Sequence, residues 1–392
     1  MNNVSESLKR FKLYNINSKN GKDRKNNLKY VNITLLVITL VLVIIGLVMV
    51  YSASYYNADL NYNNKYYFLI KQIIGAVAGV FALIFAYFFD YHKFLKLKWY
   101  ILAISIVLLL LVFLPGIGVA NYGAQRWLNL GFFTIQPSEI AKIGFVIYSS
   151  AYLSKNYKNI KKFKGVLPVL FFGGLICLLI MLEPNMSITM CVGITMITML
   201  FVGGIKIKHL LLLAIPLLVA VPILIIIEPY RLNRLMAFLN PWLNPKGEGY
   251  QLIQSLYSLG AGGLFGVGLF NSRQKYMFLP FAESDFIFSI IGEEFGFFGC
   301  LIIILLFALF IYNGIKIAFS SIDRFGAYLA TGITTVIGSQ VLINIAVVSG
   351  SIPPTGVPLP FISSGSTALV VFMFSVGVLL NISKQSKMQK LM

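Results

Sequence analysis

Long apolar stretches recur along the chain and are separated by shorter polar connections. A helix needs about 20 apolar residues to cross roughly 30 Å of hydrocarbon, and ten stretches reach or approach that length. We therefore predict an all-α, polytopic membrane protein with ten transmembrane helices. The predicted spans are 32–51, 68–89, 99–114, 139–153, 166–182, 186–203, 210–227, 286–312, 327–349 and 367–382.

Composition and charge support a membrane protein. The chain is 58% hydrophobic and 11% charged, whereas soluble domains average about 45–50% and about 25%. Its net charge is +19, which on a soluble protein would suggest nucleic acid. However, 23 of the 32 Lys and Arg lie in the two tails and in alternating connections. Because positive residues stay inside, we predict that both termini are cytoplasmic, and no nucleic-acid partner is needed.

The same reading divides the chain into three parts. Residues 1–31 are predicted to form a basic, mostly disordered cytoplasmic tail, 32–383 the membrane domain and 384–392 a short cytoplasmic tail. A large outer loop, 228–285, separates helices seven and eight, and long ordered loops are usually functional. Its glycine-broken GAGGLFGVGLF stretch is predicted to be re-entrant or interfacial.

Several carboxylates lie where an ionised group is costly, which makes them functional candidates. Glu139 and Lys142 are three residues apart on one helix face, with Ser138 as the expected N-cap. A structural ion pair and a functional pair are equally compatible with this spacing. Glu293 and Glu294 point about 100° apart on a helix, so at most one is expected to face a polar cavity. We favour a structural role, with hydrogen bonds to broken backbone nearby.

Asp285 lies where the large outer loop enters the eighth helix. Its position alone suits a simple N-cap or a catalytic group equally. Five cations are expected on the same outer surface: Arg126, Arg231, Arg234, Arg273 and Lys275. Guanidinium groups bind phosphate oxygens in pairs, although any single one is more often an interfacial anchor.

Seven longer motifs together resemble the SEDS family of peptidoglycan glycosyltransferases, the group that contains FtsW, RodA and SpoVE. The motifs, in family order, are Gly46–Ser54, Gly123–Gly131, Gln136–Lys142, Phe238–Trp242, Gly249–Leu269, Ser284–Gly299 and Gly356–Gly365. EPNMS at 183–187 is closest to the FtsW and SpoVE branch. Phe281 and Glu283 differ from the residues common at these positions in the family.

The resemblance implies polymerisation of lipid II into glycan strands on the outer membrane face during cell division. Asp285 matches the family's catalytic Asp and would act as general base in an inverting displacement. Candidate ligands for the pyrophosphate or sugar are Arg126, Lys142, Arg231, Arg234 and Lys275. Candidate supporting residues are Glu139, Glu283, Glu293, Ser364 and Ser366. A divalent cation, Mg²⁺ or Mn²⁺, is compatible with Asp285, and no organic cofactor is expected.

The resemblance also implies partners and a location. These are a class B penicillin-binding protein transpeptidase, other divisome proteins, and the bacterial plasma membrane at the septum. The main alternative is a lipid II flippase, since buried charges and midplane glycines suit a transporter. The chain has no internal repeat and its candidate charges gather near one face, which favours surface chemistry. A non-catalytic scaffold would leave Asp285 and Arg126 unexplained.

Overall fold

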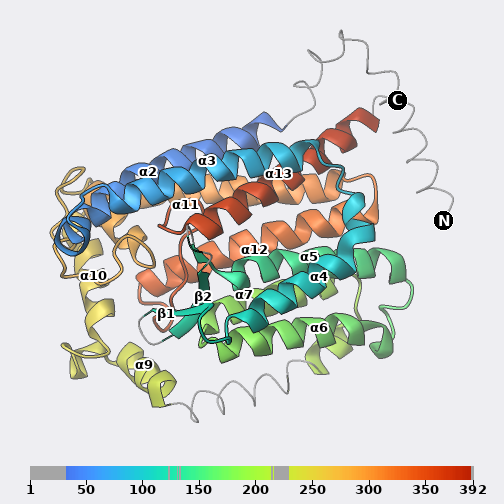
Figure 1. The fold of residues 1–392 in the computed structure, drawn as a ribbon, viewed down its shortest axis with the longest axis horizontal. Coiled ribbons are helices and arrows are strands. Elements are labelled where there is room, and N and C mark those ends of the chain that lie inside the picture. The colour runs from blue at the N-terminus through green and yellow to red at the C-terminus, as the bar shows by residue number, and fades with distance from the viewer. Residues whose placement is uncertain are drawn as a thin grey trace, which may run out of the picture.

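The computed structural model describes residues 32–389 apart from 122–123, 130, 132–133, 213–214 and 216–228. Long helices dominate this part of the chain (Figure 1). They are α2 (Ile33–Tyr62), α3 (Tyr67–Phe88), α4 (Lys93–Leu111), α5 (Pro137–Asn156), α6 (Phe163–Leu182), α7 (Met186–Val202), α11 (Ile287–Ser320), α12 (Arg324–Val348) and α13 (Ser366–Gln389). Shorter elements are α9 (Pro229–Leu239), the 3₁₀ turn η2 (Pro241–Leu243) and α10 (Tyr250–Gly262).

Seven of the described helices are long and apolar enough to span a membrane, which confirms the predicted all-α membrane class. They are α2, α3, α4, α6, α11, α12 and α13. At 17 residues, α7 is shorter, and α5 carries three charged residues that lower its hydropathy. The chain is therefore a multi-pass membrane protein.

Burial separates inner from outer helices. In α12 and α13, 72% of the apolar window is buried inside the protein, against 28% in α3 and 22% in α4. Helix α5 is buried along almost its whole length. The outer helices expose large apolar side chains such as Phe81 (69%) and Phe171 (65%). Such surfaces are rare on soluble proteins and suit contact with lipid.

The bundle has two distinct ends, which we name the terminal end and the loop end (Figure 1). Helix α2 begins and α13 finishes at the terminal end. The loop end carries α9, α10 and a small sheet. The predicted span 210–227 falls mostly outside the described residues.

The segment between α4 and α5 forms a three-stranded antiparallel sheet. The sequence alone indicated only a connection between two spans here. The strands of the sheet are β1 (Gly118–Asn121), β2 (Ala124–Asn129) and β3 (Thr134–Ile135), in the order β1-β2-β3. Leu128 pairs with Gly118 and Ile135 and is 2% exposed. The ladder is irregular at Arg126, because Val119 pairs with Trp127 and Ala120 pairs with Gln125; such a bulge changes the direction in which a side chain points.

Two helices depart from their predicted limits. Helix α2 continues to Tyr62, well beyond residue 51, where the predicted span ends. Helix α11 continues to Ser320 but breaks at Gly296, where φ is 66° and ψ is −163°. The backbone N–H of Phe297 donates to the Gly263 carbonyl at 2.9 Å, and that of Val267 to the Glu293 carbonyl at 2.9 Å. The glycine-rich loop after α10 thus satisfies backbone groups that the break exposes.

Candidate active site

Asp285 lies at the loop end, immediately before α11. The N-cap of α11 is Phe286, and no side chain caps this helix. Within the described part of the chain, no donor hydrogen-bonds the Asp285 carboxylate. The alternative that Asp285 is a simple N-cap is therefore wrong, and its carboxylate is available to a ligand.

The backbone around Asp285 is clamped by the loop that precedes α13 and by Asn344 of α12. Three successive carbonyls accept hydrogen bonds: Glu283 from the Ser364 N–H at 2.9 Å, Ser284 from the Ser363 hydroxyl at 2.5 Å, and Asp285 from the Asn344 amide at 2.8 Å. A fixed backbone holds the carboxylate in one place at little entropic cost during reaction.

The clamping loop is itself tied to neighbouring helices. Gln72 of α3 donates to the Ser363 carbonyl at 3.0 Å and accepts from the Gly365 N–H at 3.1 Å. The Ser366 hydroxyl donates to the Lys71 carbonyl at 3.2 Å. A Cβ at Gly356 would stand 2.9 Å from Oδ2 of Asp285. Ser364 therefore lies in the supporting loop and Ser366 begins α13 directly after it, and only a glycine at 356 leaves normal space beside the carboxylate.

Two arginines act electrostatically on Asp285. Burial raises the pKa of Asp285 to about 6, while the charges of Arg126 and Arg234 oppose this rise and that of Glu283 adds to it. Burial also raises the pKa of Glu283, whose carboxylate accepts a hydrogen bond from Asn57 at 3.4 Å. The structure thus brings together four residues that the sequence analysis selected.

Backbone carbonyls hold both arginines in place. Arg126 on β2 donates through Nε to the Glu183 carbonyl at 3.0 Å and through Nη2 to the Pro184 carbonyl. Arg234 on α9 donates through Nη1 to the Pro354 carbonyl at 2.9 Å. Each contact positions a cation without neutralising it, because carbonyls carry no net charge. Arg231 also belongs to α9, but its side chain lies outside the described part.

Sequence reasoning missed Glu183 as a site residue. Its side chain is fully buried at the end of α6, and neither carboxyl oxygen has a hydrogen-bond partner among the described residues. Burial raises its pKa to about 8, against the opposing charge of Arg126. This carboxyl is thus mostly protonated at neutral pH and able to donate a hydrogen bond. The available signal was a glutamate directly after an apolar span.

Glu139 and Lys142 form a buried ion pair behind the site. The Lys142 ammonium lies 2.9 Å from Oε2 of Glu139, and both side chains are 0% exposed. Lys142 also donates to Gln340 at 2.5 Å, and Gln340 donates to the Pro358 carbonyl at 3.0 Å. The pair is therefore connected to the clamping loop.

The expected N-cap of α5 was wrong. Gln136 is the N-cap, Pro137 follows it in the first turn, and no side-chain capping bond forms. The Ser138 hydroxyl is buried and has no hydrogen-bond partner within the described residues. Proline pre-sets the dihedral angle of a first helical turn, which moves the helix start one residue ahead of the serine.

Both Glu293 and Glu294 bind the loop 272–275, in keeping with the structural role that the sequence analysis favours. Glu293 accepts from the Ser272 hydroxyl at 2.5 Å and the Arg273 N–H at 2.8 Å. Glu294 pairs with Lys275 at 3.0 Å. The predicted bonding to nearby backbone is confirmed for Glu293. Lys275 is 2% exposed, so its predicted place on the outer surface was also wrong.

A divalent cation can be compared with the available ligands. Among the described residues, no group of three or more His, Cys, Asp or Glu side chains could hold a metal ion. Mg²⁺ often needs only one or two carboxylates, completed by water and substrate phosphates. Asp285, whose carboxylate has no donor among the described residues, fits that requirement.

These features define a class: a multi-pass membrane protein with a positioned carboxylate, acted on by the charges of two arginines, at one end of its bundle. The sequence matches the FtsW/RodA/SpoVE cell cycle protein family over residues 33–388, and the chain belongs to this family. It is 42% identical to stage V sporulation protein E of Bacillus subtilis over 357 residues, which cover 91% of this chain and 97% of that protein. It is 38% identical to the probable peptidoglycan glycosyltransferase FtsW of Geobacter metallireducens over 365 residues, which cover 92% of this chain and 97% of that protein.

Solved structures share the fold. One comes from a peptidoglycan synthase complex described in terms of structural coordination of polymerization and crosslinking. It aligns with a TM-score of 0.76 and 25% identity, over 91% of this chain and 98% of that one. The rod shape determining protein RodA of Thermus thermophilus aligns with a TM-score of 0.67 and 22% identity, over 90% of this chain and 96% of that one.

Proposed function

We propose that this chain is a peptidoglycan glycosyltransferase that polymerises lipid II on the outer membrane face, with Asp285 as general base. Family membership and curated relatives named as glycosyltransferases support the enzyme class. The observation that carries the site assignment is the Asp285 carboxylate, which has no described hydrogen-bond donor while the charges of Arg126 and Arg234 act on it. The loop end then faces outward and the terminal end faces the cytoplasm.

The chemistry requires one base and positive charge. Asp285 removes the proton from the acceptor sugar hydroxyl as its oxygen attacks the donor's anomeric carbon. The bond to undecaprenyl pyrophosphate breaks at the same carbon, so an α-linked donor gives a β-linked product. Arg126 and Arg234 stabilise the departing pyrophosphate. Because pyrophosphate is already a good leaving group, no second carboxylate is needed as general acid.

A divalent cation would be held by Asp285 together with the substrate pyrophosphate, and it would add positive charge for the leaving group. A class B penicillin-binding protein is the proposed partner, since a related chain of similar fold belongs to a peptidoglycan synthase complex. Divisome proteins and the septum follow from the resemblance to FtsW.

The decisive experiment is polymerisation of purified lipid II by the detergent-solubilised chain with its transpeptidase partner. Asp285→Asn removes the base while keeping size and shape, so we expect a loss of about 10²- to 10⁴-fold. Asp59→Asn is the matched control, because Asp59 has a side chain that is 46% exposed and only a distant 3.9 Å pair with Lys65. The control should polymerise normally.

Thermal unfolding should be measured for both variants, so that a loss of activity is separated from a loss of folding. Near-normal polymerisation by a folded Asp285→Asn variant would overturn the assignment of the base. Translocation of lipid II without any polymer, by the native chain with its partner, would favour the flippase instead. Neither activity under these conditions would favour the scaffold.

A further inference from the structure

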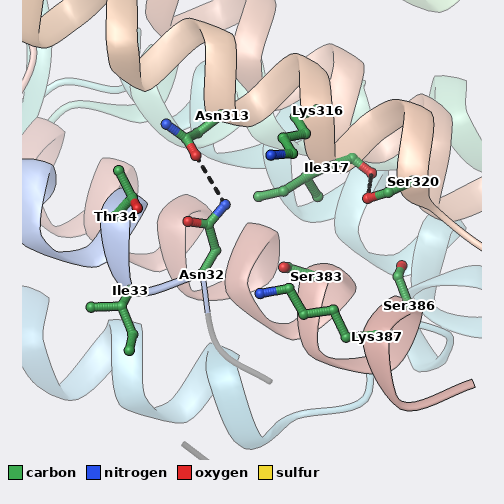
Figure 2. Close-up of a pocket in the computed structure, with 10 residues that line it drawn as sticks. All are labelled: Asn32, Ile33, Thr34, Asn313, Lys316, Ile317, Ser320, Ser383, Ser386 and Lys387. Atoms are coloured by element: carbon green, nitrogen blue, oxygen red, sulfur yellow. Dashed lines mark hydrogen bonds between the residues drawn. The ribbon is translucent and has the colours of Figure 1, made fainter. Parts of the chain in front are cut away.

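Helix α2 is longer than a membrane crossing requires. Its 30 residues, Ile33–Tyr62, extend about 45 Å at ~1.5 Å per residue, against roughly 30 Å of hydrocarbon. Its first turn lies at the terminal end, where Asn32 donates to Asn313 of α11 at 3.2 Å (Figure 2). Because the chain before it carries eight Lys and Arg, this end cannot lie inside the hydrocarbon. The excess length therefore projects from the membrane at the loop end.

The projecting end of α2 and its connection to α3 consist largely of tyrosine and asparagine. Five of the 13 residues from 55 to 67 are Tyr and four are Asn. The side chains of Asn61, Asn63 and Asn64 are exposed. Contact with lipid tails would leave such amides without hydrogen-bond partners. Flat rings beside amides instead suit a ligand that has both apolar faces and many hydroxyl groups.

The rings form a continuous row. Tyr66 stacks on Tyr51, with ring centroids 5.6 Å apart and 7° between the planes. The Tyr51 ring lies 6.2 Å from that of Tyr55, which in turn lies 6.2 Å from that of Tyr276. The hydroxyls of Tyr55 and Tyr276 share a hydrogen bond of 2.6 Å. The row thus joins the end of α2, the start of α3 and the loop after α10 at the loop end (Figure 1).

Two rings of the row present open surface in fixed positions. Tyr66 is 53% exposed although Tyr51 covers one of its faces, so the exposed area belongs to the opposite face and the edges. Tyr276 is 41% exposed. It is held by its bond to Tyr55 and by the Tyr56 ring, which packs edge to face at 4.9 Å. Rigid aromatic surfaces of this kind bind a ligand at low cost in conformational entropy.

The row adjoins the candidate active site. Asn57, which follows Tyr56 on α2, donates to the Glu283 carboxylate at 3.4 Å. Glu283 lies two residues before Asp285, and its carbonyl accepts from the Ser364 N–H at 2.9 Å in the clamp described above. A chain of sugars whose reacting unit lies at Asp285 can therefore continue onto the tyrosines.

We propose that the tyrosine row, Tyr51, Tyr55, Tyr66 and Tyr276, binds the glycan strand next to the sugar that reacts at Asp285. A sugar ring has an apolar face of C–H groups, which stacks on the tyrosine faces, and a rim of hydroxyls, which bond to the neighbouring asparagine amides. The strand is thereby retained between successive additions, which favours long products. This inference rests on the proposed function, because a polymerising enzyme is one that holds such a strand.

The test uses the full chain with its transpeptidase partner in detergent. Radiolabelled lipid II starts the strands, an excess of unlabelled lipid II follows, and product lengths are compared on a gel at equal lipid II consumption. Tyr66→Ala/Tyr276→Ala removes both open rings. Each aromatic contact contributes about twofold to tenfold in affinity, so strand retention should weaken at least about fivefold and the products should be shorter.

Two further variants and a second readout accompany this one. Tyr66→Phe/Tyr276→Phe keeps both ring faces and should still give long products. The matched control, Tyr100→Ala/Tyr312→Ala, removes tyrosines that are 70% and 61% exposed on α4 and α11, outside the row, and should behave like the native chain. Isothermal titration calorimetry with purified, uncrosslinked glycan strands measures binding without turnover, and thermal unfolding checks the fold of each variant.

Equal product lengths and equal strand binding by Tyr66→Ala/Tyr276→Ala and the control would overturn the proposal. Tyrosines also anchor helices at membrane interfaces; an equal loss of stability in both double variants, with unchanged product length, would assign the row that role instead. If the native chain made no polymer, the proposed function would fail, while weaker strand binding by the variant would still support the row. If the double variant does not fold, loss of strand binding on Tyr66→Ala, without loss on Tyr100→Ala, decides the question.

Discussion

The buried Glu139–Lys142 pair offers a test of whether these residues are structural or bind substrate. Lys142→Met keeps the side-chain volume but leaves the Glu139 carboxylate buried, with no other hydrogen-bond partner among the described residues. Removing one partner of a buried pair costs about 3–5 kcal/mol. At roughly 2 °C per kcal/mol for a large domain, the unfolding temperature should fall by at least about 6 °C.

The double variant Glu139→Gln/Lys142→Met removes both charges, and such replacements are often close to neutral. We therefore expect it to recover most of the lost stability, measured by tryptophan fluorescence during thermal unfolding in detergent. If the pair is structural, lipid II polymerisation recovers as well. Stability that recovers while activity stays lost would instead place Lys142 on the substrate. The reasoning would be refuted if Lys142→Met alone were as stable as the native chain.

Three further predictions concern the loop end. First, kcat/KM should rise with pH through about 6, because Asp285 must be deprotonated to act as a base. Glu283→Gln should move this rise to lower pH, because it removes a negative charge that raises the Asp285 pKa. A pH profile of kcat/KM for the native chain and the variant checks both. Second, Gly356→Ala should lower polymerisation about tenfold to a hundredfold, since its Cβ would crowd Asp285 at 2.9 Å, whereas Gly365→Ala, whose nearest atom is 3.8 Å away, should be active. Third, Gly296→Ala should destabilise the protein by about 1–3 kcal/mol, because φ is 66° and the new Cβ would stand 2.4 Å from the Gly266 nitrogen; thermal unfolding measures this.

The sequence alone predicted the membrane class, because long apolar runs report directly on the solvent that surrounds a helix. It also selected Asp285, because a charge beside an apolar span is costly and stands out in the pattern, and Arg126 and Arg234 as cations of the outer loops. Glu283 entered only through the family resemblance. These residues lie in segments far apart in the sequence. Motif resemblance linked them, but spacing could not show that they act on one another.

Only the tertiary structure decided how those charges are used. Spacing left Glu139 and Lys142 open between two roles, and the fold buries them as a pair linked to Gln340 of α12. Lys275 looked like an outer cation but is held by Glu294, which lies shortly before the break in α11. Both outcomes depend on contacts between distant segments, and a local hydropathy pattern carries no information about such contacts.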